Sequence, residues 1–314
     1  FQIPAFVSIP LPFYTPTREF PNPTFSGTRL GGRFNLFTYR LMALTSAPFA
    51  GLTNQFRVNT LGLAPRSRFA SPVITSSGEP VPVLYPYSRH VVPIPADFPA
   101  HAHVTGYWFL ERSDDWQPQP ELTDFLTSGP PPVYVGFGSM SGNKAKQRAR
   151  IVIDALVQSG QRGILASGWG GLDASDVPEN ILVVDEAPHD WLFDRVAAVV
   201  HHGGAGTTAA GLRAGKPTVI CPFLADQPFW GRVVHQLGVG PQPIPQRKLT
   251  VARLADAIAT AVHDTSMQQR AAELGEKIRA EDGVANAVDI IGTTMGVASR
   301  YGPAPTVTAS LEAG

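Results

Sequence analysis

Residues 197–215 read AAVVHHGGAGTTAAGLRAG, and this stretch decides the fold of the chain. A short apolar run ends at His201 and His202, three glycines follow, and an alanine- and threonine-rich segment continues from Thr207. A continuous apolar run is typical of a parallel strand buried on both faces, and the glycines favour a tight turn into a helix. We therefore predict a strand–turn–helix unit centred on HHGGAGTT.

The same alternation repeats along residues 133–295. Candidate strands are the apolar runs VYVGFGS, RGILASG, NILVVDE, AAVVHHG and PTVICPF. Amphipathic segments predict helices at 144–159, 189–196, 207–214, 228–237, 251–262 and 266–279. This pattern predicts a doubly wound α/β domain, which binds ligands outside the carboxyl ends of its strands.

Residues 1–112 have a different character, because many of the prolines of the chain fall in its first part. An extended apolar run opens the region, apolar residues at helical spacing predict a helix over 32–62, and short strands are expected in VPVLYPY and HVTGYWF. We predict a first domain at 1–112, a linker at 113–132 rich in Pro, Asp, Ser and Gln, and a mobile tail at 296–314.

Composition excludes several classes of protein. The formal charge is zero with no visible basic stripe, which argues against nucleic-acid binding. One cysteine, Cys221, makes a disulfide framework impossible. The chain has no apolar stretch long enough for a transmembrane helix and opens without a signal-peptide pattern. We expect a soluble, cytoplasmic protein.

The glycine-rich loop has the composition of a phosphate-binding site. Helix N-termini favour anions, glycines let backbone approach a ligand, and Thr207 and His202 add donors. A plain strand-to-helix turn is the alternative interpretation. The loop matches neither the Walker spacing nor G-x-G-x-x-G, and the chain has no H-E-x-x-H or paired C-x-x-C pattern for zinc.

HHGGAGTT, followed by Gln227 in FLADQPFWG, resembles the donor-site signature of glycosyltransferase family 1. The sterol 3-beta-glucosyltransferase branch and its bacterial natural-product relatives are the nearest match. The segments VYVGFGSM, GILASGWGGL, VVDEAPHDWLF, LPFYTPTREFPNP and GGRFNLFTYRLMAL resemble further parts of that family. The resemblance implies a GT-B fold, with a complete C-terminal Rossmann-like domain and an N-terminal Rossmann-like domain whose start is missing.

The resemblance also implies a donor site for a UDP-sugar. The backbone of Ala187 would pair with uracil, His202 would contact the diphosphate, and Asp226 and Gln227 would bind sugar hydroxyls. Core packing is an equal alternative for Trp169, and helix capping is an alternative for Asp226. The implied donor-binding residues are Ser139, Trp169, Glu186, Ala187, His189, His202, Gly204, Ala205, Gly206, Thr207, Asp226 and Gln227.

The activity implied by the resemblance is inverting transfer of a hexose, with glucose expected, from a UDP-sugar to a hydroxyl of a lipophilic acceptor. No metal or other cofactor is expected, because helix-end amides, hydroxyls and histidine can offset the charge of the leaving diphosphate. Phe13, Tyr14 and Phe20 are candidate acceptor contacts, with core packing as their alternative role.

The sequence does not identify the catalytic residue, nor does it decide between transfer and simple binding of a nucleotide sugar. The family's usual base lies in a segment that nothing in this chain matches, so no catalytic residue is assigned. A nucleotide-sugar-binding protein with weak or no transferase activity is therefore the main alternative, and a nucleotide-sugar epimerase is a weaker one. Exposed sheet edges would also favour a homodimer.

Overall fold

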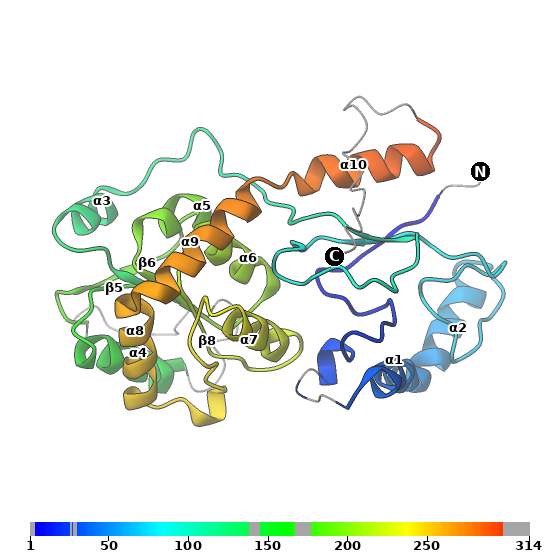
Figure 1. Cartoon of the computed structure of the whole chain (residues 1–314), viewed down its shortest axis with the longest axis horizontal. Coiled ribbons are helices and arrows are strands. Elements are labelled where there is room, and N and C mark those ends of the chain that lie inside the picture. Colours follow the sequence, from blue (N-terminus) through cyan, green and yellow to red (C-terminus); the bar gives the residue numbers. More distant parts are fainter. Residues whose placement is uncertain (1–3, 26, 28–29, 138–144, 167–176, 298–314) are drawn as a thin grey trace, which may run out of the picture.

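The computed structural model describes residues 4–25, 27, 30–137, 145–166 and 177–297 (Figure 1). The predicted contacts Ser139 and Trp169, and the tail from residue 298, lie outside the described residues. The described chain holds a five-stranded and a three-stranded parallel sheet, as the short apolar runs predicted.

The larger sheet has the strand order β6-β5-β4-β7-β8. Its strands are β4 (Val133–Gly136), β5 (Gly163–Ala166), β6 (Ile181–Val184), β7 (Ala198–His201) and β8 (Thr218–Ile220). The chain builds outward from β4 through β5 to β6, then returns to the other side of β4 with β7, where Gly136 pairs with His201. This reversal is the topological switch point, at which doubly wound sheets bind ligands.

Helices cover both faces of this sheet (Figure 1). They are α4 (Ala145–Gln158), α5 (His189–Leu192) with the 3-10 turn η5 (Phe193–Arg195), α6 (Ala205–Arg213), α7 (Gln227–Gln236), α8 (Val251–His263) and α9 (Thr265–Arg279). α4 packs with α8, and α6 packs with α9. The structure thus confirms the predicted helices of this domain and its doubly wound class.

Two further helices were not predicted. α3 (Pro120–Thr127) lies inside the predicted linker, begins with proline in its first turn and buries Leu122. α10 (Gly283–Thr294) follows the last predicted helix, and the side chain of Asp282 accepts a hydrogen bond from the backbone N–H of Ala285, 2.9 Å away, at its start. The sequence did not predict α3 because prolines flank it, and it did not predict α10 because of the glycines at 283 and 292; both residue types indicate turns.

The N-terminal half contains β1 (Val7–Ser8), β2 (Val83–Tyr85) and β3 (Ala102–Val104) in the order β1-β2-β3. The 3-10 turn η1 (Pro23–Phe25) precedes the predicted helix over 32–62, which is divided into α1 (Gly32–Ser46) and α2 (Ala50–Asn59). The 3-10 turn η2 (Ala47–Phe49) separates them at Pro48, which has no N–H to continue the helical hydrogen bonds.

The two halves share buried contacts. One apolar cluster contains Tyr85 and Tyr87 of the N-terminal half together with Leu212 and Trp230 of the C-terminal half. The chain also crosses back to the N-terminal half at its end, since α10 lies beside the 102–107 segment (Figure 1). None of the helices in the described ranges has both the length and the hydropathy of a bilayer span.

The return of α10 depends on close backbone packing. The Asn286 side-chain amide donates a hydrogen bond to the carbonyl oxygen of Thr105, 2.8 Å away. Gly283 lies so near Gly106 that a Cβ added at 283 would be 2.3 Å from the Tyr107 carbonyl oxygen and 2.5 Å from the Gly106 carbonyl. Only glycine fits at the start of α10 in this arrangement.

Candidate functional site

The turn between β7 and α6 requires glycine. Gly203 has a φ of +92°, a region that disfavours side chains. A Cβ at Gly203 would lie 2.7 Å from Cγ2 of Ile220 and 3.2 Å from the backbone oxygen of Gln227. The turn therefore holds the start of α6 directly against the end of β8 and the start of α7.

The N-terminus of α6 presents free backbone donors. The backbone N–H of Thr208 bonds to the carbonyl oxygen of Gly204, whereas the N–H groups of Ala205, Gly206 and Thr207 make no hydrogen bond within the described ranges. No side chain caps the helix at Gly204, and an added Cβ at Gly206 would meet no atom within 4 Å. Unpaired amides at the positive end of a helix dipole form an anion site.

The two histidines of the loop point in different directions, with ring planes 89° apart. His201 is fully buried, and its Nδ1 accepts a hydrogen bond from the backbone N–H of Gly203 at 2.9 Å. Burial, reinforced by the neighbouring His202 and His189, lowers the pKa of His201 to about 3. His201 is a neutral structural residue that fixes the turn.

His202 is half-buried beside the anion site. A Cβ at Gly204 would lie 2.6 Å from its Nε2, so the imidazole packs directly against Gly204, the residue before α6. Burial lowers the pKa of His202, and the Asp226 carboxylate opposes that shift. Its Nδ1 is buried and unpaired among the described residues. A neutral imidazole here can donate one hydrogen bond to a phosphate oxygen.

Asp226 and Gln227 follow β8 and begin α7. Asp226 occupies the N-cap position of α7, as its alternative role predicted, but its side chain makes no capping hydrogen bond: its Oδ2 instead accepts a hydrogen bond from the indole Nε1 of Trp230 at 3.1 Å. The Oε1 of Gln227 accepts backbone N–H bonds from Phe223 and Leu224, at 2.7 and 3.2 Å. These contacts fix both side chains beside the glycine turn.

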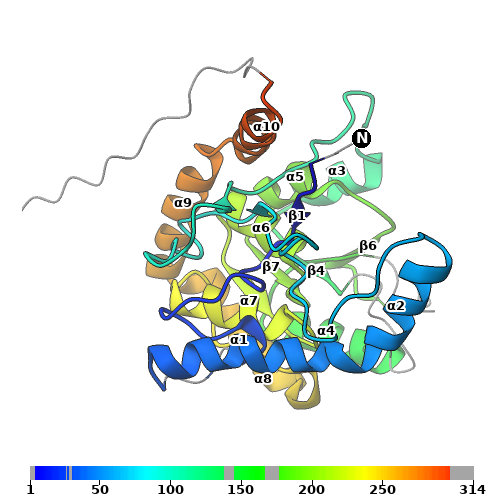
Figure 2. The same ribbon diagram turned by 90° about the vertical axis from the view of Figure 1, so that its right-hand side faces the viewer.

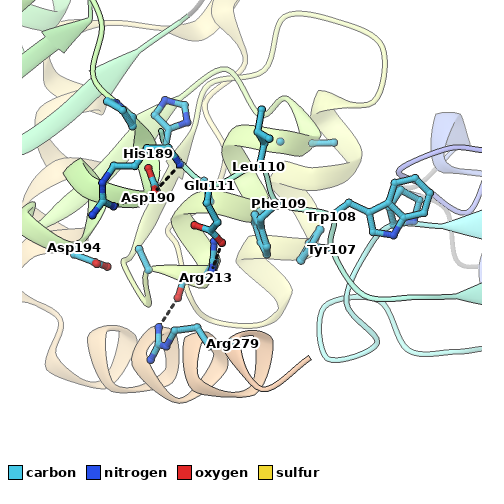
Figure 3. Close-up of a pocket in the computed structure, with 18 of the residues that line it drawn as sticks. Tyr107, Trp108, Phe109, Leu110, Glu111, His189, Asp190, Asp194, Arg213 and Arg279 are labelled. Atoms are coloured by element: carbon cyan, nitrogen blue, oxygen red, sulfur yellow. Dashed lines mark hydrogen bonds and ion pairs between the residues drawn. The ribbon is translucent and has the colours of Figure 1, made fainter. Parts of the chain in front are cut away.

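A cleft of about 850 Å³ separates the two halves next to this loop (Figure 3). On the C-terminal side it is lined by Glu186, His189, Ala205 and Gly206, and on the other side by residues 107–113. The segments that follow β6 and β7 therefore meet at this cleft, as the doubly wound pattern predicted for them, whereas the predicted residues after β4 and β5 lie outside the described ranges.

His189 forms part of the cleft wall, as the first residue of α5. Its ring stacks on Phe193, with centroids 4.4 Å apart and planes 17° apart, and its Nε2 lies 3.4 Å from the hydroxyl of Tyr134. Burial lowers the pKa of His189, partly offset by Asp190. Just before it, the backbone N–H and C=O of Ala187 make no hydrogen bond within the described ranges, which leaves both available to a base edge.

Ion pairs across the cleft were not anticipated from sequence. Arg213 Nη2 lies 2.7 Å from Oε1 of Glu111, and Arg112 Nη1 lies 3.1 Å from Oδ2 of Asp190. Figure 3 shows the Glu111–Arg213 pair, with Arg279 bonded to the backbone of Arg213. The partners lie far apart in sequence, so no local motif marks them.

The structure divides the predicted donor residues into two groups. Glu186, His189, Ala205 and Gly206 line the cleft. The others that the structure describes lie next to these along the chain or around the glycine turn, and they are Ala187, His202, Gly204, Thr207, Asp226 and Gln227. The free N-terminus of α6 joins the two groups.

The predicted acceptor contacts also divide. Phe13 and Tyr14, which meet edge to face with ring centroids 5.2 Å apart, line a second pocket of about 590 Å³ between α1, α2 and residues 66–72. Phe20 lies outside that lining, and both Phe20 and Tyr14 pack against the apolar cluster that contains Trp230. Core packing, the alternative stated for these aromatics, therefore describes Phe20 and also applies to Tyr14.

The buried His201 predicts acid sensitivity. Its pKa is about 3 in the folded chain and about 6.5 when unfolded, so between these values only the unfolded chain binds the proton. The free energy of unfolding is therefore highest above pH 6.5 and decreases as the pH drops, by about 2 kcal/mol at pH 5. Urea unfolding across this range should show a smaller pH dependence for His201→Gln than for the parent. Replacing the exposed His235 by Gln is the control; equal pH slopes in the parent and His201→Gln would contradict the assignment.

The sequence has relatives among known glycosyltransferases. Residues 152–291 match the family described as Erythromycin biosynthesis protein CIII-like, C-terminal domain. The chain is 41% identical over 290 residues to the sterol 3-beta-glucosyltransferase UGT80B1 of Arabidopsis thaliana, covering 91% of this chain and 46% of that protein. The family match and these relatives support the resemblance to glycosyltransferase family 1. A sterol 3-beta-glucosyltransferase of Emericella nidulans is 40% identical over 304 residues, which cover 92% of this chain and 21% of that protein.

Solved structures of glycosyltransferases share the fold of this chain. The glycotransferase of kitacinnamycin superposes with a TM-score of 0.64 at 19% identity, over 93% of this chain and 70% of that one. CalG4, the calicheamicin glycosyltransferase, gives 0.58 at 19% identity over 78% of this chain and 60% of that one. The GT-B assignment is thereby confirmed. The chain spans about half the length of the plant relatives it matches.

Proposed function

We propose that this chain forms the donor site of an inverting glycosyltransferase, which moves a hexose, glucose by our inference, from a UDP-sugar to a hydroxyl of a lipophilic acceptor. The observation that supports this most directly is the N-terminus of α6, whose unpaired amides at Ala205 and Gly206 face the cleft between the halves. A diphosphate placed there receives backbone hydrogen bonds and the helix dipole together.

We propose positions for the uridine and the sugar of the donor from the groups on either side of α6. The free backbone of Ala187 suits a uridine because it offers one hydrogen-bond donor and one acceptor. The ring of His189 offers an aromatic surface beside it. At the sugar end, the Oε1 of Gln227 is occupied by backbone N–H groups, so the proposed contact to a hydroxyl is donation from its amide nitrogen. Asp226, bound to Trp230 through Oδ2, keeps Oδ1 as the acceptor.

The chemistry requires stabilisation of a leaving nucleoside diphosphate. The acceptor hydroxyl attacks the anomeric carbon as the bond to the diphosphate breaks, and negative charge grows on the phosphate oxygens. The α6 amides, the hydroxyl of Thr207 and the His202 imidazole are preorganised to meet that charge. We therefore propose that transfer needs no metal ion, and activity should persist in EDTA.

The acceptor is proposed to be lipophilic, with the base that deprotonates it unassigned. Phe13 and Tyr14 in the second pocket supply an apolar aromatic wall, and the relatives are named for sterol glucosylation. We propose a cytoplasmic location, which cell fractionation can test. A homodimer stays a proposal that native mass measurement can test.

Replacing His202 by Ala should weaken UDP binding by about 10- to 100-fold, because one hydrogen bond to a charged phosphate oxygen is lost. Calorimetric titration with UDP measures the effect. His235→Ala, an exposed position on α7, is the matched control and should bind UDP like the parent. Unchanged affinity in His202→Ala would remove His202 from the site.

Transfer is tested separately with UDP-glucose and a panel of sterol and flavonoid acceptors, with products followed by mass. Glucosylated product supports the proposal. UDP binding without product from any acceptor would favour a nucleotide-sugar-binding protein instead. Absence of UDP binding would refute both functions.

A further inference from the structure

The surface of α1 and α2 exposes unusually many apolar side chains. Among the described residues, half of the exposed large apolar side chains fall between Leu30 and Phe69, and they include Phe49 at 66% and Leu52 at 71% exposure. None of the residues of α2, all of which the structure describes, is buried. Because a short helix owes most of its stability to packing of an apolar face, α2 lacks a partner for that face.

The same region is exclusively basic. Residues 20–78 contain no Asp or Glu, but they contain six arginines, at positions 29, 33, 40, 57, 66 and 68. The whole chain has a net charge of zero, so this segment carries a local excess of positive charge that the rest of the chain balances. Such a surface attracts a negatively charged partner.

Arginines and apolar side chains share one helical stripe. On α1, the exposed residues Arg33, Phe37, Arg40 and Leu44 are spaced by four, three and four positions, which places them on one face. The apolar pattern continues at the start of α2 with Phe49, Leu52 and Phe56, spaced by three and four. We call these seven residues the arginine–apolar face.

The arginine–apolar face lies at the end of the molecule away from the large sheet. Figure 1 shows α2 at the opposite end of the long axis from α3 and β5, and Figure 2 shows α1 and α2 along the outer edge. The second pocket, with Phe13 and Tyr14, is lined by residues of these two helices. The face therefore adjoins the second pocket, whose lining shares no residue with that of the cleft.

We infer that the arginine–apolar face binds the surface of an anionic lipid bilayer. Apolar and aromatic side chains flanked by arginines are the composition of segments that lie in the interface of a membrane, where acyl chains take the apolar groups and anionic headgroups pair with the cations. None of the described helices meets the criteria for a span, which fits a surface-bound arrangement. The inference does not depend on the proposed transferase activity.

A second copy of the chain is a weaker partner for this face. A two-fold symmetric contact would bring the face of one copy against the same face of the other. Arg33 and Arg40 would then meet arginines, with no carboxylate anywhere in 20–78 to neutralise them. Lipid headgroups supply the missing negative charge.

Flotation with lipid vesicles tests the inference. The chain should bind vesicles that contain 30% phosphatidylserine in phosphatidylcholine, and it should bind pure phosphatidylcholine at least about tenfold more weakly. Leu52→Ser with Phe56→Ser should weaken binding to anionic vesicles by about tenfold or more, since two apolar contacts are lost. Arg33→Gln with Arg40→Gln should weaken binding to anionic vesicles by about 10- to 30-fold, and raising the salt concentration should also weaken it.

Matched controls separate the face from general surface properties. Val288→Ser removes an exposed apolar side chain on α10, and Arg247→Gln removes an exposed cation of the C-terminal half; neither should change vesicle binding. No binding to anionic vesicles, or equal binding to both lipid compositions, would overturn the inference. A dimer that Leu52→Ser with Phe56→Ser abolishes would assign the face to a second copy and would overturn it as well.

Discussion

Alanine at position 203 should lower the free energy of unfolding by about 2–4 kcal/mol and abolish detectable UDP binding. Two causes add. The positive φ of Gly203 disfavours a side chain, and the new Cβ would overlap Cγ2 of Ile220 at 2.7 Å. The backbone oxygen of Gln227 blocks movement in the other direction. Relief requires the turn to shift, which displaces the start of α6 from the cleft. Urea unfolding measures the first effect, and calorimetric titration with UDP measures the second.

Gly206→Ala is the matched control, three residues further along the same loop. An added Cβ at 206 meets no atom within 4 Å, so alanine should leave stability unchanged or raise it slightly, because alanine favours helix. UDP binding should nevertheless weaken, since the methyl group enters the cleft beside the free amides. Parent-like stability in Gly203→Ala would contradict the strain argument, and parent-like UDP affinity in Gly206→Ala would contradict the placement of the diphosphate.

Gly283→Ala should detach α10 from the N-terminal half, at a cost of about 2 kcal/mol or more in stability. The atoms that a Cβ at 283 would meet, the carbonyl groups of Tyr107 and Gly106, belong to the backbone and cannot rotate away. Loss of this packing also separates Asn286 from the carbonyl of Thr105. Amide hydrogen exchange should accelerate across α10 and the 105–107 segment, and the melting temperature should fall.

Gly292→Ala on the same helix is the control for that result. Its added Cβ would make only an ordinary contact, 3.5 Å from the backbone oxygen of Val297, so exchange in α10 should slow or stay unchanged. Slow exchange in Gly283→Ala, equal to that of the parent, would show that α10 does not depend on the glycine contact.

The sequence was most informative where local pattern and tertiary environment agree. The short apolar runs from Val133 to Ile220 became the five strands. Four of these strands are almost wholly buried on both faces, which produces a continuous apolar run, whereas the edge strand β6 exposes Val183. Gly203 was recognised as a turn residue for the same physical reason that the structure gives, a backbone conformation with positive φ. α10 was missed because its glycines oppose helix propensity, and its packing against Gly106 overrides that preference.

Features that depend on contacts distant in sequence could not be predicted. The pair Glu111–Arg213 joins the end of the first half to α6, and nothing near either residue indicates the other. The side-chain contacts of Asp226 and Gln227 were likewise not predicted. Asp226 binds Trp230 and Gln227 binds the backbone of residues 223–224, whereas the sequence suggested a capping role for Asp226. Phe13 and Phe20 are alike in the sequence, and only the folded chain shows that Phe13 lines the second pocket whereas Phe20 packs against the apolar cluster.

The return of α10 to the N-terminal half has a mechanical consequence. The chain connects the two halves twice, first through residues 113–119 and again between α9 and α10 at residues 280–282. With a single connection, the halves could separate by bending one segment alone. Two connections require both segments to bend, and the apolar cluster shared by Tyr85 and Trp230 must open as well. Widening of the cleft that holds Glu186 and Gly206 is therefore opposed at both segments.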